Sequence, residues 1–183
     1  MSQGTSTMIA GTRRSGTDDR ELLARIAAGG EDAFTELVRR YQRRFYGIAR
    51  RMLGDDREAE DAVQTAFLRI HRHAAAYREE WSGATWLYRI LTNVVIDHWR
   101  KRRRLGEVPL SATDVVGTAG NAERVDVDRA LAKLPAEARA ILLLCYVEEL
   151  PYAEIARARG ISINTVKTQL LRAKGLMRRY LKR

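Results

Sequence analysis

The sequence predicts an all-α protein in which two small helical domains are joined by a flexible linker. Apolar residues recur at steps of three and four along most of the chain, which is the spacing of one face of a helix. Only 3 of the 183 residues are proline, and no segment alternates convincingly with the period of two that a half-buried strand shows. Residues 105–123 lack helical periodicity and contain no Lys or Arg, so we assign them to the linker.

Four helices are expected before the linker, in a domain that spans residues 18–104. The long apolar stripe of the second helix stops at Gly54, a residue type that commonly ends helices. Asp55 and Glu58 follow with the spacing of a capping box, which marks the start of a third helix. The four helices are expected to start near these residues: Asp18, Phe34, Asp55 and Thr85.

Four more helices are expected in a second domain, residues 124–183. The first two cover residues 125–134 and 136–150, and the second of them has an unusually wide apolar face. Pro151 suits the first turn of the third helix, because its missing N–H would have no intrahelical partner there.

The third and fourth helices of this domain have the spacing of a helix-turn-helix. Ala156 stands four residues before Gly160, and Val166 stands six residues after it. This order places a small residue where two helices cross, a glycine able to take positive φ at the turn, and a β-branched residue against the crossing. Ser162 or Asn164 can cap the fourth helix.

The charge of the chain points to a polyanionic partner such as nucleic acid or an acidic membrane surface. Its formal net charge is +10, and residues 155–183 contain nine Lys and Arg and no acid. One face of the last helix is apolar, and the other carries side chains suited to base edges and phosphates in a major groove. A solvated basic helix is the simpler alternative, but the turn glycine and the apolar spacing disfavour it. The residues expected to contact DNA are Asn164, Thr165, Lys167, Thr168, Gln169, Arg172 and Lys174. For Leu171, packing under the helix and contact with a thymine methyl remain equally open.

A second group of residues suits unpaired DNA. All three tryptophans fall within residues 81–99, and the basic run "RKRRR" follows at once. Stacking on an aromatic ring stabilises an unpaired base by about 1–3 kcal/mol, although each tryptophan taken alone is more commonly a core residue. On the helix that carries this run, a polar stripe lies opposite the apolar face: Arg89, Asn93, Asp97, Arg100 and Arg104.

Three segments together resemble the extracytoplasmic-function (ECF) group of sigma-70 family sigma factors. The segment "EDAVQTAFLRIHRHAAAY" resembles region 2.2, and "TWLYRILTNVVIDHWRKRRR" resembles regions 2.3 and 2.4. The segment "LAKLPAEARAILLLCYVEELPYAEIARARGISINTVKTQLLRAKGLM" resembles region 4. The resemblance covers nearly all of residues 18–183 in the expected order, and the short linker in place of a region 3 domain is typical of the ECF group.

This resemblance implies a transcription initiation factor that binds core RNA polymerase, directs it to promoters and promotes DNA melting. It implies no enzymatic activity, cofactor or metal. The expected contacts with the β′ clamp helices are Asp61, Ala62, Val63, Gln64, Phe67 and Leu68. The expected minus-10 contacts are Trp86, Arg89, Asn93, Asp97, Arg100 and Arg104, with Asn93 near the pocket for a flipped base.

The resemblance also has implications beyond the minus-10 element. The last helix would recognise the minus-35 element. The β flap of the polymerase would be a further contact of this chain. In the family, a short loop can interrupt the helix near Asn93. An anti-sigma protein, often membrane-tethered or stress-sensing, is the expected inhibitor.

Other classes fit less well. A metal-dependent hydrolase could use the acids of residues 55–61 with His71 and His73, but Asp61 and His71 would lie about 15 Å apart along a helix. A helix-turn-helix regulator that binds operator DNA alone is the stronger alternative. Cys145 is the only cysteine, so an internal disulfide is excluded. No apolar run is long enough to span a membrane, and residues 1–17 are expected to form a disordered tail rather than a signal peptide, which suits a cytoplasmic protein.

Overall fold

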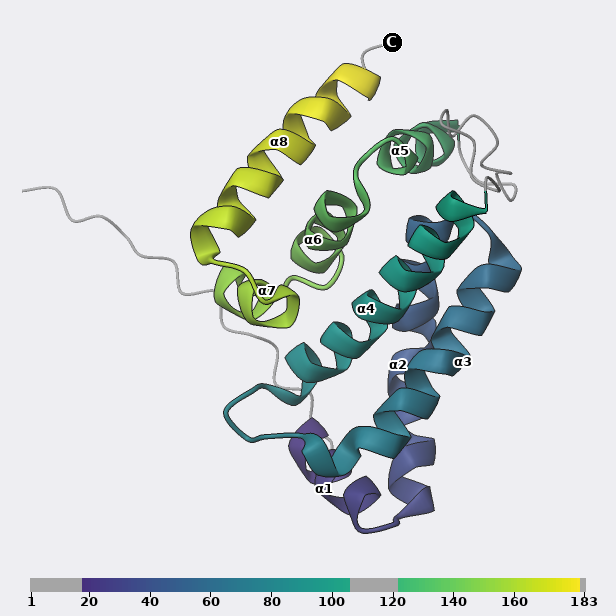
Figure 1. Cartoon of the computed structure of the whole chain (residues 1–183), viewed down its shortest axis with the longest axis vertical. Helices are drawn as coiled ribbons and strands as arrows, with labels where there is room; N and C mark the ends of the chain where they lie inside the picture. The colour runs from purple at the N-terminus through teal and green to yellow at the C-terminus, as the bar shows by residue number, and fades with distance from the viewer. Residues whose placement is uncertain (1–17, 106–121, 182–183) are drawn as a thin grey trace, which may run out of the picture.

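Eight α-helices and one short 3-10 helix make up the described parts of the chain, residues 18–105 and 122–181 of a computed structural model (Figure 1). No strand occurs within these residues, and the predicted all-α fold is confirmed. The N-terminal bundle consists of α1 (Asp19–Ala27), α2 (Glu31–Leu53), α3 (Asp56–His73), η1 (Ala74–Ala76) and α4 (Gly83–Arg104). The C-terminal bundle consists of α5 (Ala122–Ala132), α6 (Ala136–Tyr146), α7 (Tyr152–Arg159) and α8 (Ile163–Leu181).

The long helix α2 forms the centre of the N-terminal bundle. It packs against α1, α3 and α4, and its predicted apolar stripe lies in the core. Phe45, which is fully buried, stacks on Phe67 of α3 with the ring centroids 5.2 Å apart. Gly54 ends α2 with a φ of 76°, a conformation that a residue with a side chain rarely adopts.

Local capping sets the starts of α3 and α4. The Asp55 carboxylate accepts a hydrogen bond from the Glu58 backbone N–H at 2.9 Å, as the capping-box spacing predicts. The Ser82 hydroxyl caps α4 by accepting from the Thr85 N–H at 3.1 Å, so that α4 starts two residues before the predicted position. α4 then continues without a break to Arg104, and the loop that can interrupt this helix in the family does not occur here.

The C-terminal bundle contains the predicted helix-turn-helix in α7 and α8. Gly160 has a φ of 65°, and the Ser162 hydroxyl accepts from the Thr165 N–H at 3.0 Å, so Ser162 rather than Asn164 caps α8. α5 starts three residues before the predicted position. α6 ends at Tyr146 rather than Leu150, because Glu149 takes a φ of 53° and leaves the helical conformation.

The two bundles pack against each other. α4 lies between α3 on one side and α6 and α7 on the other, and α2 contacts α5 and α6 (Figure 1). This arrangement accounts for the wide apolar face of α6, which also packs on α7 and α8 and buries Ala140, Ile141, Leu143 and Leu144. The predictions for residues 1–17 and for most of the linker lie outside the described residues, as do the last two residues of the predicted second domain.

Candidate nucleic-acid interface

The outer face of α8 exposes the residues predicted to contact duplex DNA. Val166, Leu170 and Ala173 are buried against the bundle, whereas six of the seven predicted DNA contacts are exposed and Gln169 is half-buried. Leu171 is 72% exposed, so that it does not pack under the helix. α8 therefore presents a polar and basic surface in which Leu171 is the most exposed of three apolar side chains, the other two being Ile163 and Leu181 at the ends of the helix.

Several of these side chains are held in place by neighbours. The Thr168 hydroxyl donates a hydrogen bond to the Asn164 carbonyl at 2.9 Å, and the hydroxyls of Thr165 and Ser162 lie 2.9 Å apart. The Lys174 ammonium lies 5.0 Å from the centre of the Tyr146 ring, and its contact with this phenol raises the pKa of Lys174. Lys174 is therefore a permanent positive charge on the surface of α8.

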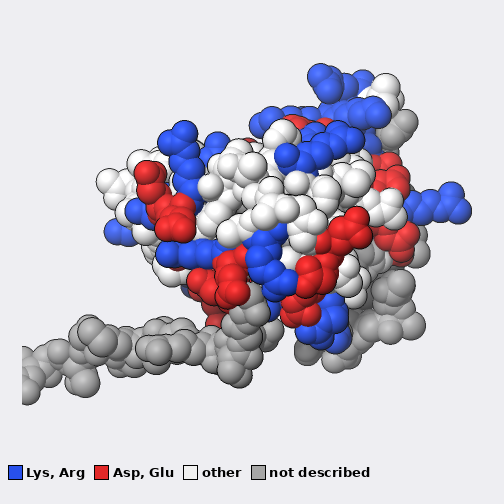
Figure 2. All heavy atoms as spheres, turned by 90° about the horizontal axis from the view of Figure 1, so that it is seen from below, with Lys and Arg blue, Asp and Glu red and all other residues white. Residues whose placement is uncertain are grey.

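The excess of positive charge is not spread evenly over the molecule. Seen from below, Lys and Arg side chains alternate closely with Asp and Glu side chains (Figure 2). α8, in contrast, contains no acid over its 19 residues. A polyanion would therefore be attracted to α8 more strongly than to the mixed face.

A hollow beside α4 has the chemistry that an unpaired base requires. Its volume is about 380 Å³, and it lies between α3 and α4 at the N-terminal half of α4. The Tyr77 ring meets Trp86 edge to face with the centroids 5.7 Å apart, and the Arg89 guanidinium lies 4.9 Å from the centre of the Trp81 ring. The hollow is lined by Arg69, His73, Ala76, Trp86, Arg89, Ile90 and Asn93.

The basic end of α4 forms a second hollow of about 790 Å³. The Arg103 guanidinium lies 5.3 Å from the centre of the Trp99 ring. Asp97 lies 3.9 Å from Arg69 and 4.0 Å from Arg100, so that part of this positive charge is already balanced within the protein. The structure thus brings the predicted α4 residues onto one exposed face, with Trp86 half-buried at its edge.

Tyr88 does not belong to this aromatic surface. Its ring is fully buried in the core, and its hydroxyl donates a hydrogen bond to Glu148. Burial and the neighbouring carboxylate raise the pKa of Tyr88 well above the ordinary range.

The six residues predicted to contact polymerase do not share one surface. Ala62, Val63 and Phe67 are buried in the N-terminal bundle. Asp61, Gln64 and Leu68 are exposed, and Leu68 is 57% exposed. Of the six predicted polymerase contacts, these three are therefore the ones that are open to a partner on α3.

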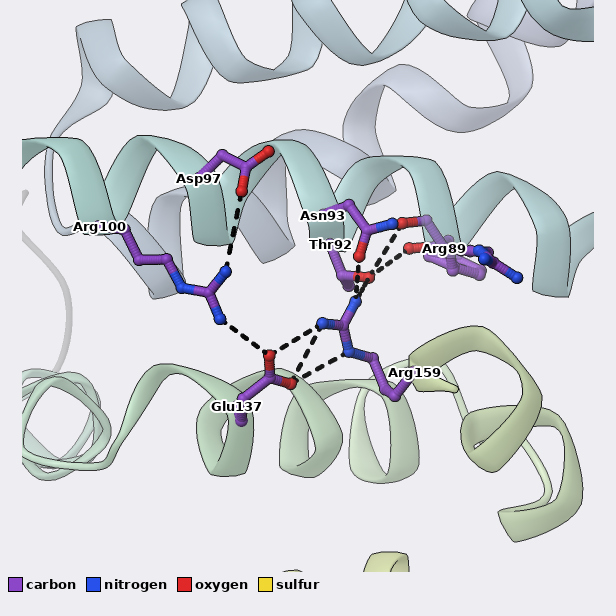
Figure 3. Close-up of polar contacts among 8 residues, drawn as sticks. Arg89, Thr92, Asn93, Asp97, Arg100, Glu137 and Arg159 are labelled. Carbon is purple, nitrogen blue, oxygen red and sulfur yellow. Dashed lines mark hydrogen bonds and ion pairs between the residues drawn. The ribbon is translucent and has the colours of Figure 1, made fainter. Parts of the chain in front are cut away.

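The sequence did not predict a polar network between the bundles. The Arg159 guanidinium donates to the Asn93 amide oxygen at 2.7 Å and to the Thr92 hydroxyl at 2.8 Å, and it pairs with Glu137 at 3.0 Å (Figure 3). Glu137 also lies 3.7 Å from Arg100. Arg159 is followed directly by the turn glycine, and nothing in that position distinguishes it from an ordinary surface arginine.

The described residues do not form a metal site, because no group of three His, Cys, Asp or Glu among them could hold an ion. Within the same residues, no helix combines the length and the apolarity that crossing a membrane requires.

Comparison with known proteins places both halves of the chain in one family. The models of Sigma-70 region 2 and of Sigma-70, region 4 match residues 37–105 and 124–177. The chain is 35% identical over 167 residues to the ECF RNA polymerase sigma factor SigM of Mycobacterium tuberculosis (strain ATCC 25618 / H37Rv), which covers 89% of this chain and 84% of SigM. The chain belongs to the ECF sigma factors.

Other known proteins are similar to this ECF sigma factor over most of its length. It is 31% identical over 183 residues to the ECF RNA polymerase sigma factor SigW of Bacillus subtilis (strain 168), which covers 89% of this chain and 96% of SigW. The structure of CnrH in complex with the cytosolic domain of CnrY matches with a TM-score of 0.72 and 25% identity, over 90% of this chain and 97% of that chain. Because both halves match, these relatives support a sigma factor rather than a helix-turn-helix regulator that acts alone.

Proposed function

We propose that this ECF sigma factor binds core RNA polymerase, directs it to promoters through minus-10 and minus-35 elements, and promotes melting of the DNA. In this assignment residues 18–104 act as region 2, residues 105–123 as the linker and residues 124–183 as region 4. The factor itself catalyses no reaction, and it acts in the cytoplasm, where polymerase and promoter DNA meet.

The observation that supports the melting step most directly is the aromatic hollow beside α4. Trp86 and Asn93 line this hollow, so that an extruded base would meet an aromatic side chain and an amide. The cations of the basic run lie farther along the same helix, where they could bind the phosphates of the same strand. We therefore propose the same six minus-10 contacts that the sequence predicts: Trp86, Arg89, Asn93, Asp97, Arg100 and Arg104.

Recognition of the minus-35 element is assigned to the exposed face of α8. Arg172 can pair bidentately with guanine in the major groove, whereas exposed Leu171 suits contact with a thymine methyl group. Arg178 and Arg179, farther along the helix, are placed to contact phosphates and so to fix the position of the helix on the duplex.

Binding of core polymerase is assigned to α3 for the β′ clamp helices and to the C-terminal bundle for the β flap. On α3, exposed Asp61, Gln64 and Leu68 would make the contacts, and buried Ala62, Val63 and Phe67 would hold the helix in position. An anti-sigma protein is the inhibitor that we propose for this chain, in line with the complex of the sigma factor RpoE with the anti-sigma factor NepR from Bartonella quintana.

Transcription with purified core polymerase tests this function. Core enzyme, with and without the purified chain, would transcribe fragments of the DNA of the source organism, and the 5′ ends of the transcripts would be mapped. We expect a small set of start sites that depend on the added chain and share upstream sequences near minus-10 and minus-35. Tight operator binding by the chain alone, without start-site selection by the mixture, would instead support the regulator alternative.

A further inference from the structure

We propose that Trp81 is a further DNA-binding residue of the N-terminal bundle, and that its ring stacks on the base next to the one that enters the aromatic hollow beside α4. Trp81 lies in the loop that joins η1 to α4, outside the helix that carries the predicted minus-10 residues. This inference rests on the function proposed above and assigns a second unpaired base to the same face of the protein.

Trp81 differs from the other two tryptophans in its packing. Trp86 and Trp99 are partly buried against the hydrophobic core, and both belong to α4. Trp81 is half-buried, but within the described residues it is not part of this core. An aromatic side chain that a loop leaves partly exposed is available to a partner. The usual role of a tryptophan as a core residue therefore does not account for Trp81.

Arg89 links the Trp81 ring to the hollow. Its guanidinium lies 4.9 Å from the centre of the Trp81 ring, and the same side chain lines the hollow together with Trp86 and Asn93. The ring is therefore near the hollow on the scale of a DNA strand, in which neighbouring stacked bases are about 3.4 Å apart. One base in the hollow and its neighbour on Trp81 would place Arg89 between two nucleotides, beside the phosphate that joins them.

The chemistry of arginine suits this position. Its guanidinium has five N–H donors in one plane, so that it can lie over an aromatic ring and bind a phosphate at the same time. The second base would stack on the face of the Trp81 indole opposite Arg89. Stacking on a ring is tolerant of sequence, because every base has a π face. We therefore expect Trp81 to stabilise the unpaired strand rather than to select one base.

The loop holds Trp81 in place without DNA. The Tyr77 hydroxyl donates a hydrogen bond to the Trp81 carbonyl at 2.7 Å, and the Trp81 N–H donates to the Arg78 carbonyl at 3.1 Å. The Tyr77 ring also meets Trp86 edge to face, so that one side chain contacts both the loop and the wall of the hollow. A ring held in this way loses little conformational freedom when a base stacks on it, which raises affinity. Tyr77 is therefore a positioning residue for Trp81.

Helix α1 anchors the loop to the bundle. Gly83 is the first residue of α4, and a Cβ added to it would lie 2.6 Å from the Cβ of Asp19, so that α1 and α4 approach closely here. The Asp19 carboxylate accepts hydrogen bonds from Arg40 of α2 at 2.7 Å and from the Tyr41 hydroxyl. η1 also packs on α1. Both ends of the loop are therefore fixed by contacts with α1.

Holoenzyme binding to a pre-melted promoter tests the stacking role. The promoter is one mapped in the transcription assay, with its minus-10 element held open by mismatches in one strand. Trp81→Leu keeps an apolar side chain without a π face, and Trp81→Phe keeps a smaller ring. Trp81→Leu should bind this DNA about 5-fold or more weakly than the wild type, and Trp81→Phe should stay within about 2-fold of it, because stacking needs a ring. Binding to closed duplex in the cold should be nearly the same for all three proteins.

Removal of single bases locates the base that Trp81 contacts. An abasic nucleotide replaces each position of the open minus-10 element in turn. Where the missing base is the one that stacks on Trp81, the wild type and Trp81→Leu should bind equally, because neither can make the contact. Asn93→Ala should equal the wild type at a neighbouring position, where the base enters the hollow. If both variants reach the wild type at the same position, or if Trp81→Phe loses as much affinity as Trp81→Leu, Trp81 does not bind a second base.

Hydrogen exchange in the full free chain tests the role of Tyr77. Tyr77→Phe removes the hydroxyl and keeps the ring, and the matched control Tyr46→Phe removes a hydroxyl that donates to Asp56, also at 2.7 Å. Amide exchange in residues 77–82 should be about 3-fold or more faster in Tyr77→Phe than in the control, because the loop loses a hydrogen bond. Unchanged exchange would overturn the positioning role. This measurement involves no polymerase, so a failure of the sigma-factor assignment would appear only in the transcription assay.

Discussion

The Arg159 guanidinium and the Asn93 amide oxygen lie 2.7 Å apart, although the two residues are 66 positions apart in the sequence and belong to different bundles. Arg159 is nearly buried, with 6% of its side chain exposed, and it also pairs with Glu137 of its own bundle. A charged donor fixed in this way holds the amide in one orientation. The contact therefore links the position of the C-terminal bundle to the state of a residue that we assign to DNA melting.

A double-mutant cycle measures this link. Arg159→Met and Asn93→Ala should each lower the free energy of unfolding, and the double variant should lose less than the sum. We expect a coupling of about 1 kcal/mol, because one partner is charged but Asn93 is exposed. Urea unfolding followed by circular dichroism gives the four values. Strict additivity would mean that the two side chains do not interact in solution.

Two arginines on α8 should differ in the kind of binding that they support. Arg172→Ala should weaken holoenzyme binding by about 1–3 kcal/mol at promoters with one preferred base in the minus-35 element, and should relax the preference at that position. Arg178→Ala removes the same charge farther along the helix and should weaken binding evenly across sequences. Competition assays with a minus-35 library separate the two results, and equal losses for both variants would contradict the assignment of Arg172.

Two neighbouring residues of α3 separate polymerase binding from stability. Leu68→Ala should weaken the complex with core polymerase and leave the melting temperature nearly unchanged, because Leu68 is exposed. Phe67→Ala should lower the free energy of unfolding by about 3–5 kcal/mol, because this ring is buried against Phe45. Thermal unfolding and a binding assay with core enzyme give both quantities. An unstable Leu68→Ala variant, or a stable Phe67→Ala variant that fails to bind, would reverse the two roles.

The sequence predicted most of the helices, because their starts and ends depend on nearby residues. Gly54 and Gly160 take the left-handed conformation that ends a helix, and Asp55 caps the next one. The end of α6 was wrong by four residues, because apolar residues continue beyond the point where Glu149 turns the backbone. When the residue with positive φ is not a glycine, the apolar pattern of the sequence does not show where the helix ends.

The sequence predicted the candidate site less completely than the helices. The motif that resembles region 2.2 contains apolar residues at helical spacing, and the structure shows that two of the predicted polymerase contacts, Ala62 and Val63, lie in the core. The contacts of Arg159 and Arg139 join the two bundles and depend on how these bundles dock. No periodicity within one helix contains that information.

Alkaline pH should destabilise the interface between the bundles through Tyr88. Burial and Glu148 raise the pKa of this phenol above its ordinary value of 10.0, so that the folded chain keeps a proton that the unfolded chain loses. The free energy of unfolding should therefore be highest below pH 10 and fall as the pH rises above that value. Tyr88→Phe should lower stability near neutral pH, because Glu148 loses a donor, but should show a shallower decline above pH 10. If the free energy of unfolding declines equally steeply with pH in the wild type and in Tyr88→Phe, the alkaline loss of stability is caused by a group other than Tyr88.

Removal of the Asn93 amide should affect DNA melting more than promoter binding. Asn93 is exposed and lines the aromatic hollow, so that Asn93→Ala should leave the fold intact but remove a partner for an extruded base. The loss of one such contact corresponds to about 1–3 kcal/mol in the stability of the melted complex. Permanganate reactivity of thymines in the minus-10 element reports melting, and gel shift of the holoenzyme on duplex promoter reports binding.

Gln42→Ala, which removes an exposed side-chain amide on α2, is the matched control. If Asn93→Ala melts DNA as well as the control, Asn93 has no role in melting. If Asn93→Ala binds duplex promoter more weakly but melts it normally, Asn93 contacts the double helix instead.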